Sequence, residues 1–242
     1  SDKAFHGETQ TLCAMLVMFD ILPDAADRLV RNRLLELVSG TNCQMQTGFL
    51  GSRFLLPALS EIGRSDIAYR FLCNEEFPGW GYSVRNGATT VWERWNGYSE
   101  ETGFYEPAMN SYNHYAFGAV CEWFFEYMAG ARPLEAGFKR ILLAPEICPE
   151  SKVREVFMER RTPHGRISSS WRVRDGGCDW TVRIPSGTRG TVCLPKSFLT
   201  GLQVVDDLRD RELDVMEGID PAGRLCFELP SGDFRIAFTL GG

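Results

Sequence analysis

Residues 80–98, WGYSVRNGATTVWERWNGY, and residues 109–128, MNSYNHYAFGAVCEWFFEYM, form the stretch around which the rest of the chain is organised. Together they hold four of the six tryptophans and one of the three histidines. The stretch combines aromatic rings with amides, hydroxyls and one glutamate set between tryptophans. Such a mixture of apolar surface and a few polar groups is typical of a sugar-binding site.

The Asn86-Gly87 pair predicts a tight turn, because both residues tolerate the positive φ that a hairpin turn needs. We therefore expect a β-hairpin with strands over residues 81–85 and 88–95.

In the second of these strands, side chains alternate between two faces, so Glu93 shares a face with Val91 and Trp95 while Arg94 points away. A carboxylate held against apolar groups is poorly solvated and becomes more basic, which prepares it to act as a general base. The alternative interpretation is a glutamate at a strand end, paired with an arginine from elsewhere.

A helix is predicted over residues 112–128, with Ser111 as its cap. Asn113 and His114 then lie in its first turn, where His114 can donate a hydrogen bond to a ligand hydroxyl or serve as a packing residue. The buried stripe of this helix is predicted to consist of Phe117, Val120, Phe124 and Met128.

Helical patterns account for most of the N-terminal half. Residues 8–19, 24–40, 54–62 and 66–73 show apolar residues at helical intervals, bounded by Pro23, Gly40 and Gly63. With residues 112–128 this makes about five helices. Helix pairs joined by short loops indicate part of an α/α toroid, and we assign residues 1–132 to this helical domain.

Gly and Pro between residues 130 and 133 mark a boundary, and short extended runs follow it. Strands at intervals of about ten residues indicate an antiparallel β-sandwich over residues 133–242. Trp171 and Trp180 are read as core residues, with a sugar platform as the alternative. The predicted strands are residues 140–144, 153–160, 166–173, 178–184, 190–195, 203–205, 225–229 and 235–240.

Composition excludes several classes of protein. The chain has 44% hydrophobic and 24% charged residues, as globular proteins do. No apolar run approaches the ~18 residues of a membrane span.

The net charge of −6 divides into −7 over residues 1–130 and +1 over residues 131–242. Without a basic stripe, nucleic acid is excluded as a partner, and an acidic half rich in aromatics suits a neutral polyhydroxylated ligand.

The eight cysteines are scattered without CxxC spacing, so we expect neither a zinc site nor any other metal or cofactor. Cys13 and others lie among apolar neighbours, which suits buried free thiols and favours a reducing compartment. Cytoplasm and periplasm both stay open, because the first residues show no signal-peptide pattern and a trimmed exported protein would look the same.

Several motifs together resemble the α-L-rhamnosidases of glycoside hydrolase family 78. They are GATTVWERW (residues 87–95) and MNSYNHYAFGAVCEW (109–123), with ETQT (8–11), TGFLGSRFLLPALSEIGRSDIAYRFL (47–72) and FPGWGY (77–82) upstream. KRILLAPEI (139–147) and VRIPSGTRGTVCLP (182–195) are similar to the C-terminal β-domain of that family. The similarity covers nearly the whole chain.

The resemblance implies an (α/α)₆ catalytic barrel of twelve helices and hydrolysis with inversion of configuration. It implies a general base at Glu93 and a rhamnose contact at His114. Trp80, Trp92, Trp95 and Asn113 are assigned more loosely to the sugar pocket. The implied partner is a rhamnose-containing oligosaccharide or glycoside.

The general acid of that family lies upstream, in a DCPQR-type motif that this chain lacks. We therefore expect a C-terminal fragment that is inactive alone. Exposed helix faces would then favour self-association or packing with the missing N-terminal part. Other acids that can be considered as substitutes are Glu75, Glu76, Glu100, Glu101, Glu106 and Glu122.

Three other interpretations remain. The chain can be a non-catalytic carbohydrate-binding protein that keeps the aromatic pocket, a structural β-sandwich with a helical extension, or a glycosidase of another family with the same barrel.

Overall fold

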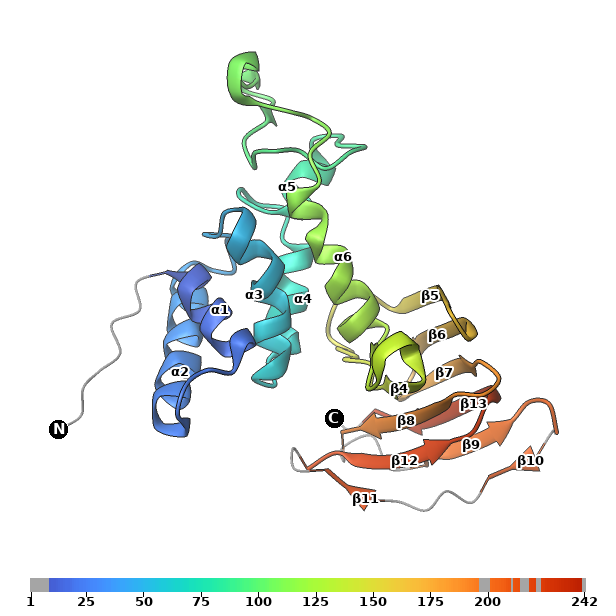
Figure 1. Cartoon of the computed structure of the whole chain (residues 1–242). Coiled ribbons are helices and arrows are strands. Elements are labelled where there is room, and N and C mark those ends of the chain that lie inside the picture. Colours follow the sequence, from blue (N-terminus) through green and yellow to red (C-terminus); the bar gives the residue numbers. More distant parts are fainter. Residues whose placement is uncertain (1–8, 196–200, 210, 214–217, 221–222, 241–242) are drawn as a thin grey trace. The chain divides into compact units, whose positions relative to one another are not determined.

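The computed structural model describes residues 9–195, 201–209, 211–213, 218–220 and 223–240, and the chain divides into two compact units, Ser1–Trp123 and Phe124–Gly242. The first unit is mainly helical and the second is built from β-strands (Figure 1). This confirms the predicted class, an α plus β chain with helices first and mainly antiparallel sheets after them. No helix in the described ranges has the length and apolarity that a membrane span requires.

Four helices form the body of the first unit. α1 packs against α2 and α3, and α3 packs against α4. The Thr9 hydroxyl caps α1 by accepting a hydrogen bond from the backbone N–H of Leu12. Gly63, at a φ of +74°, ends α3 and lets the chain turn into α4. The helices are α1 (Gln10–Phe19), α2 (Asp24–Gly40), α3 (Phe49–Glu61) and α4 (Ser65–Cys73).

A hydrogen bond in the core of this unit involves a tryptophan. Trp123 is fully buried, and its indole N–H donates to the Ser60 hydroxyl at 2.9 Å. Because a buried donor without a partner is costly, this bond fixes α6 (Val120–Trp123) against α3. The other fully buried large side chains here are Tyr69, Phe71, Leu34, Leu55, Leu56 and Leu59.

The predicted β-hairpin over residues 81–95 is wrong. Residues Trp80–Arg85 form helix α5, and residues 88–95 form no strand. Gly87 does adopt a positive φ, +80°, but it does so at the end of a helix, where the N–H of Ala88 donates to the carbonyl of Ser83. A glycine at positive φ occurs at helix C-termini as well as in hairpin turns. The Asn86-Gly87 pair therefore could not distinguish a helix end from a hairpin.

A β-hairpin does occur in this region, but further along the chain. The short strands β1 (Tyr98–Ser99) and β2 (Gly103–Phe104) pair antiparallel, and the 3₁₀ turn η1 (Pro107–Met109) follows them. In Figure 1 the segment between α5 and α6 extends beyond the ends of the neighbouring helices.

The predicted helix over residues 112–128 begins later than expected. The chain forms the 3₁₀ turn η2 (Ala116–Ala119), then α6, and the second unit opens with a π-helical turn, η3 (Phe124–Met128). Ser111 does not cap a helix: its hydroxyl accepts from the N–H of Asn113 in a local turn. Asn113 and His114 therefore precede the helix instead of lying in its first turn.

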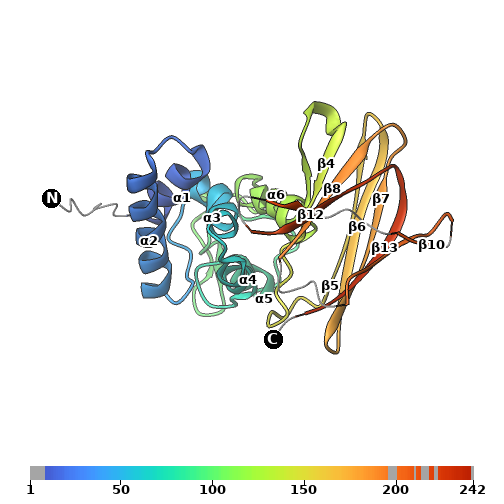
Figure 2. The same cartoon turned by 90° about the horizontal axis from the view of Figure 1, so that it is seen from below.

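The second unit contains two sheets, which form separate layers in Figure 2. All eight predicted strands are present, with ends shifted by a few residues. The six-stranded sheet has the order β10-β9-β13-β7-β6-β5 and is antiparallel throughout. Its strands are β5 (Glu155–Thr162), β6 (Gly165–Arg174), β7 (Gly177–Ile184), β9 (Gln203–Asp206), β10 (Arg211–Glu212) and β13 (Gly232–Thr239).

The five-stranded sheet has the order β11-β12-β8-β4-β3. It corrects the expectation of a purely antiparallel sandwich, because β4 and β8 run parallel. A short 3₁₀ turn, η4 (Ala136–Phe138), lies between β3 and β4. The strands are β3 (Ala131–Pro133), β4 (Arg140–Leu143), β8 (Arg189–Leu194), β11 (Gly218–Ile219) and β12 (Leu225–Leu229).

Trp171 and Trp180 are core residues, as predicted, with exposed fractions of 1% and 0%. They face each other across β6 and β7. The Trp171 indole donates to the carbonyl of Met128, and the Trp180 indole donates to the hydroxyl of Ser169. Both rings are covered, so neither offers a platform to a sugar.

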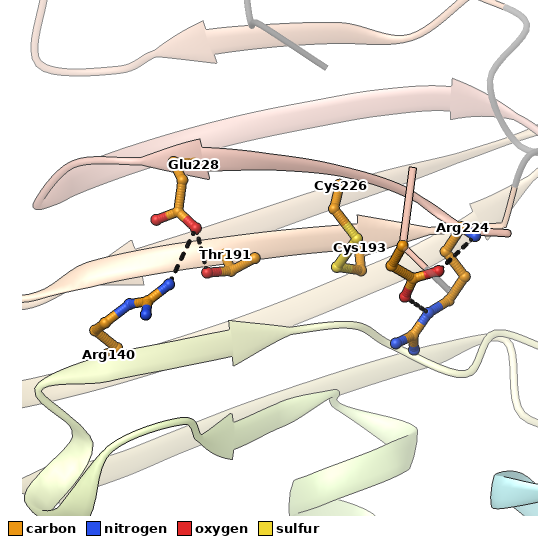
Figure 3. Close-up of a disulfide and its surroundings, with 7 residues drawn as sticks. Arg140, Thr191, Cys193, Arg224, Cys226 and Glu228 are labelled. Atoms are coloured by element: carbon orange, nitrogen blue, oxygen red, sulfur yellow. Dashed lines mark hydrogen bonds and ion pairs between the residues drawn. A yellow bond between two sulfur atoms is a disulfide. The ribbon is translucent and has the colours of Figure 1, made fainter. Parts of the chain in front are cut away.

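Cys193 and Cys226 form a disulfide between the paired strands β8 and β12 (Figure 3). The scattered cysteine spacing in the sequence did not indicate this pairing. The bond lies beside Asp220, which forms an ion pair with Arg224. Further along these strands, Glu228 of β12 binds Thr191 of β8 and also Arg140 of the neighbouring strand β4. The cysteines described as free thiols are Cys13, Cys43, Cys73, Cys121, Cys148 and Cys178.

Candidate functional site

A cleft of about 520 Å³ lies within the first unit. The loop before α3, the segment that precedes α5 and the segment after α5 all contribute to it. It is therefore built from parts of the chain that are distant in sequence. The residues that line it are Thr47, Gly48, Phe49, Phe77, Pro78, Glu93, Arg94, Trp95, Asn96 and Phe117.

One wall of the cleft is aromatic. The rings of Trp95 and Phe117 stack with their centroids 3.8 Å apart, and Phe49 meets Phe117 edge to face at 5.2 Å. Trp80 supports this wall: its ring packs against Trp95, and its indole N–H donates to the carbonyl of Phe117 at 2.9 Å. The Trp95 indole donates to the carbonyl of Thr47. A rigid aromatic wall of this kind suits the apolar face of a sugar ring.

Glu93 lines the cleft and is half-buried. Its backbone N–H donates to the carbonyl of Ser111, which fixes its position. Within the described residues, the Glu93 carboxylate makes no hydrogen bond or ion pair. Arg94 lines the same cleft, with its guanidinium 5.0 Å from the ring of Tyr105. The expectation that Glu93 and Arg94 point to opposite sides of a strand is wrong, because the segment is not a strand.

Two segments are held together by backbone bonds and bring Glu93 near His114. The N–H of His114 donates to the carbonyl of Val91 at 2.8 Å, and the N–H of Glu93 donates to the carbonyl of Ser111 at the same distance. The hydroxyl of Thr90 also bonds the carbonyl of Tyr112. Glu93 and His114, 21 positions apart in sequence, therefore lie on two segments that are paired with each other by backbone hydrogen bonds.

The imidazole of His114 stacks on Phe49, a residue of the cleft wall, at 4.9 Å. Trp92 and Asn113 are not among the residues that line the cleft. Trp92 is 7% exposed and packs against Tyr112. Asn113 is exposed, and its N–H bonds the Ser111 hydroxyl. Of the residues named from the sequence, Glu93 and Trp95 line the cleft and Trp80 packs against Trp95, whereas His114, Trp92 and Asn113 are not among the lining residues.

The sequence reasoning missed the contribution of α3. Thr47, Gly48 and Phe49 line the cleft, and Phe49 connects the aromatic wall to His114. These residues belong to the TGFLGSRFL motif, which was noted as part of a resemblance but was not assigned to the site. Nothing in the spacing along the chain placed that motif opposite the WERW segment.

The other acids that were considered are engaged elsewhere or absent from the cleft. Glu122 makes a two-pronged ion pair with Arg53, with nitrogen–oxygen distances of 2.8 and 3.1 Å. Glu76 lies 3.9 Å from Arg85. Of the described residues that line the cleft, Glu93 is the only carboxylate.

A group of potential metal ligands, Cys193, Asp220 and Cys226, lies in the five-stranded sheet and not at the cleft. The two sulfurs are joined in the disulfide, and Asp220 binds the side chain of Arg224. Thiolates, not disulfide sulfurs, are the ligands that zinc takes from cysteine, so this arrangement does not suit an ion.

Two protein-family profiles match the chain. The bacterial α-L-rhamnosidase six-hairpin glycosidase domain matches residues 1–128, and the bacterial α-L-rhamnosidase C-terminal domain matches residues 130–208. An α-L-rhamnosidase of Streptomyces avermitilis is 37% identical over 240 residues, which are 99% of this chain and 22% of that protein. One from Formosa agariphila is 38% identical over 81% of this chain and 21% of that protein.

Solved structures agree with these matches. The Streptomyces avermitilis α-L-rhamnosidase complexed with L-rhamnose superposes with a TM-score of 0.86 and 33% identity, over 98% of this chain and 22% of that one. The α-L-rhamnosidase from Dictyoglumus thermophilum gives a TM-score of 0.80 at 25% identity, over 96% of this chain and 25% of that one. The chain therefore spans about a fifth of the length of the curated relatives it matches. On the strength of the two profiles, the relatives and the shared fold, this chain belongs to the bacterial α-L-rhamnosidase family.

Proposed function

We propose that this chain supplies the general-base half of the active site of an inverting α-L-rhamnosidase, which hydrolyses terminal α-L-rhamnosides. The observation that carries this proposal is the position of Glu93. It is half-buried in a cleft of about 520 Å³, next to the Trp95–Phe117 stack, and its carboxylate has no hydrogen-bond or ion-pair partner within the described residues. An unpaired carboxylate beside an aromatic wall can accept a proton from a water molecule that approaches a bound sugar.

The chemistry of inversion gives each group its role. The Glu93 carboxylate takes a proton from water as the water oxygen attacks the anomeric carbon. A carboxylic acid on the other side of the sugar protonates the leaving glycosidic oxygen, at roughly 6.5–9.5 Å from the base. Trp95 and Phe117 pack against the apolar face of the sugar, and the guanidinium of Arg94 offers hydrogen-bond donors in the cleft. The imidazole of His114, stacked on the cleft residue Phe49, offers another donor.

The acid has to come from another part of a longer protein. Glu93 is the only carboxylate among the described residues that line the cleft, and a single carboxylate cannot act as base and acid in the same step. The curated relatives are about five times longer than this chain. We therefore expect the chain alone to be inactive and the longer polypeptide to be active.

The test is the hydrolysis of an aryl α-L-rhamnoside by this chain and by a longer polypeptide that contains it. We expect turnover by the longer polypeptide only, a β-L-rhamnose product seen first by NMR, and a loss of about 10²–10⁴-fold in rate with Glu93→Gln. Glu36→Gln, at an exposed position of α2 outside the cleft, serves as the matched control and should keep the rate. Retention of configuration, or full activity of the Glu93→Gln variant, would overturn the assignment.

The single carboxylate also supports a second candidate, a carbohydrate-binding protein without catalysis. In that case the longer polypeptide would bind L-rhamnose but would not hydrolyse rhamnosides, and Glu93→Gln would leave the affinity intact.

A further inference from the structure

The imidazole of His114 is held by ring contacts. It stacks on Phe49 with a centroid distance of 4.9 Å and an angle of 16° between the planes. It also lies nearly parallel to the ring of Tyr115, at 5.3 Å and 8°. Tyr115 is 88% exposed, so Phe49 is the better anchored of the two rings.

Phe49 is 42% exposed, and a second ring contact holds its side chain. It is the first residue of α3, and its ring meets the buried ring of Phe117 edge to face at 5.2 Å. Phe117 in turn stacks on Trp95. A continuous set of ring contacts therefore runs from the aromatic wall of the cleft, through Phe49, to His114.

A hydrogen bond defines which nitrogen of His114 carries the proton. The backbone N–H of Ala116 donates to Nδ1 at 3.3 Å, so Nδ1 is the acceptor. In a neutral imidazole the proton then resides on Nε2, which becomes the only donor of the ring. A rotation of the ring by half a turn about its Cβ–Cγ bond would exchange Nδ1 with a carbon and break this bond.

We propose that Phe49 is a positioning residue for His114. By stacking on the imidazole it keeps Nδ1 directed at the N–H of Ala116, and so it presents Nε2–H as the donor to a hydroxyl of a sugar in the cleft. The role toward a sugar rests on the proposed function, whereas the orientation of the ring is a property of the free protein. Stacking sets the plane of the ring, and the Ala116 bond selects one of the two orientations, related by a half-turn about Cβ–Cγ, that share this plane.

The test measures the His114 ring directly. ¹⁵N-edited NMR spectra of the imidazoles at mildly alkaline pH distinguish a protonated from an unprotonated nitrogen, and His114→Gln identifies the His114 signals among those of the three histidines. We expect unprotonated Nδ1, protonated Nε2, and ring protons shifted upfield by the stacked rings. Phe49→Leu should move the ring protons downfield and mix the two tautomers, and Phe49→Tyr should restore the wild-type pattern. Leu50→Ala, at the neighbouring exposed position, is the matched control and should change neither.

A second measurement links the ring to the sugar. L-rhamnose binding by the longer polypeptide should weaken roughly five- to tenfold in Phe49→Leu, the cost of one misdirected hydrogen bond, and should recover in Phe49→Tyr. An unchanged His114 spectrum in Phe49→Leu, or a wild-type ring protonated on Nδ1, would overturn the positioning role. If the spectra change as expected but wild-type protein does not bind rhamnose, the proposed function fails and the ring orientation stands. If Phe49→Leu does not fold, the spectra of wild-type protein and Phe49→Tyr still decide the tautomer.

Discussion

Cys178 shows how burial determines the chemistry of a single side chain in this protein. It lies in β7 and is 2% exposed. Burial raises the pKa of its thiol to about 12, from an ordinary value of 9.0, because the charged thiolate is poorly solvated there. Burial likewise raises the pKa of the Cys148 thiol to about 11, with a further contribution from Glu150. Both thiols are therefore protonated, and unreactive, at neutral pH.

This raised pKa predicts a loss of stability at alkaline pH. The unfolded thiol of Cys178 ionises near pH 9.0, while the folded thiol stays protonated up to about 12. The unfolded state thus binds fewer protons in this window, so stability is full below pH 9.0 and falls as the pH rises toward 12. Urea unfolding at neutral pH and at a pH inside the window should show a larger fall for wild-type protein than for Cys178→Ala.

The exposed Cys121 provides the control for this experiment. Cys121→Ala should show the same fall in stability as wild-type protein. An equal fall in Cys178→Ala and wild-type protein would show that the buried thiol does not contribute.

Three consecutive serines offer a second prediction at the residue scale. Ser169 is fully buried in β6, where its hydroxyl donates to the carbonyl of Ala129 and accepts from the indole of Trp180. Ser169→Ala should destabilise the protein by about 1–3 kcal/mol, because it leaves a buried indole N–H without a partner. Ser170→Ala, whose side chain is on the outer face of the same strand, should cost much less in the same urea titration. Equal losses would show that the buried network contributes little.

At the scale of elements, strands were easier to predict than the segment around the cleft. In β6 and β7 buried and exposed residues alternate, and this pattern is already present in the sequence. The short strands β3, β10 and β11 have two or three residues each, too few for a period to be recognised. The pairing of β4 with β8 depends on contacts between segments almost fifty residues apart, which no local pattern records.

The sequence indicated which residues between α5 and α6 are candidates for the site, but not the structure that this segment adopts. Gly87, at a positive φ, is compatible with a helix end and with a hairpin turn. In the structure it follows helix α5, and the indole of Trp80 in that helix donates a hydrogen bond to the carbonyl of Phe117. Glu93 was identified as the base candidate through the family resemblance and through a strand alternation that the structure does not have. Its place in the cleft depends instead on the backbone bond with Ser111. Phe49 and Thr47 were missed because their approach to the cleft is a consequence of the packing of α3.

The disulfide joins two elements and yields a prediction about both. Cys193 and Cys226 are 33 positions apart, and the bond closes the chain that connects β8 to β12. A loop of this length corresponds to about 3–4 kcal/mol of stabilisation in the chain-entropy account. The double variant Cys193→Ala/Cys226→Ala should therefore increase amide hydrogen exchange in β8 and β12. Reductant should reproduce the effect in wild-type protein and leave the double variant unchanged. Unaltered exchange would show that the paired strands are stable without the bond.

At the scale of the whole molecule, the helical unit leaves large apolar side chains exposed. Leu12 on α1, Leu29 on α2 and Leu50 on α3 are 45%, 43% and 71% exposed, and Ile21 between α1 and α2 is 67% exposed. In relatives five times longer, further chain is available to cover such positions. Exposed apolar surface of this kind favours association.

We therefore predict that this chain associates with itself as its concentration rises. Sedimentation velocity should show larger species at high concentration, and the variant Leu12→Glu/Leu29→Glu should reduce them, because each charge has to be desolvated on association. Leu208→Glu, an exposed apolar position in the second unit, is the control. A single monomeric boundary at all concentrations would contradict this prediction.

The most direct test of the account is a tryptophan-fluorescence titration of this chain with L-rhamnose, beside D-glucose. Trp95 lines the cleft and Trp80 packs on it, whereas Trp171 and Trp180 are buried in the second unit and provide a constant background. If the chain holds a preformed half of a rhamnose site, L-rhamnose should give a saturable change that D-glucose does not. His114→Ala should weaken it. An equal response to both sugars, or no response to L-rhamnose, would contradict the claim that this chain carries that half-site.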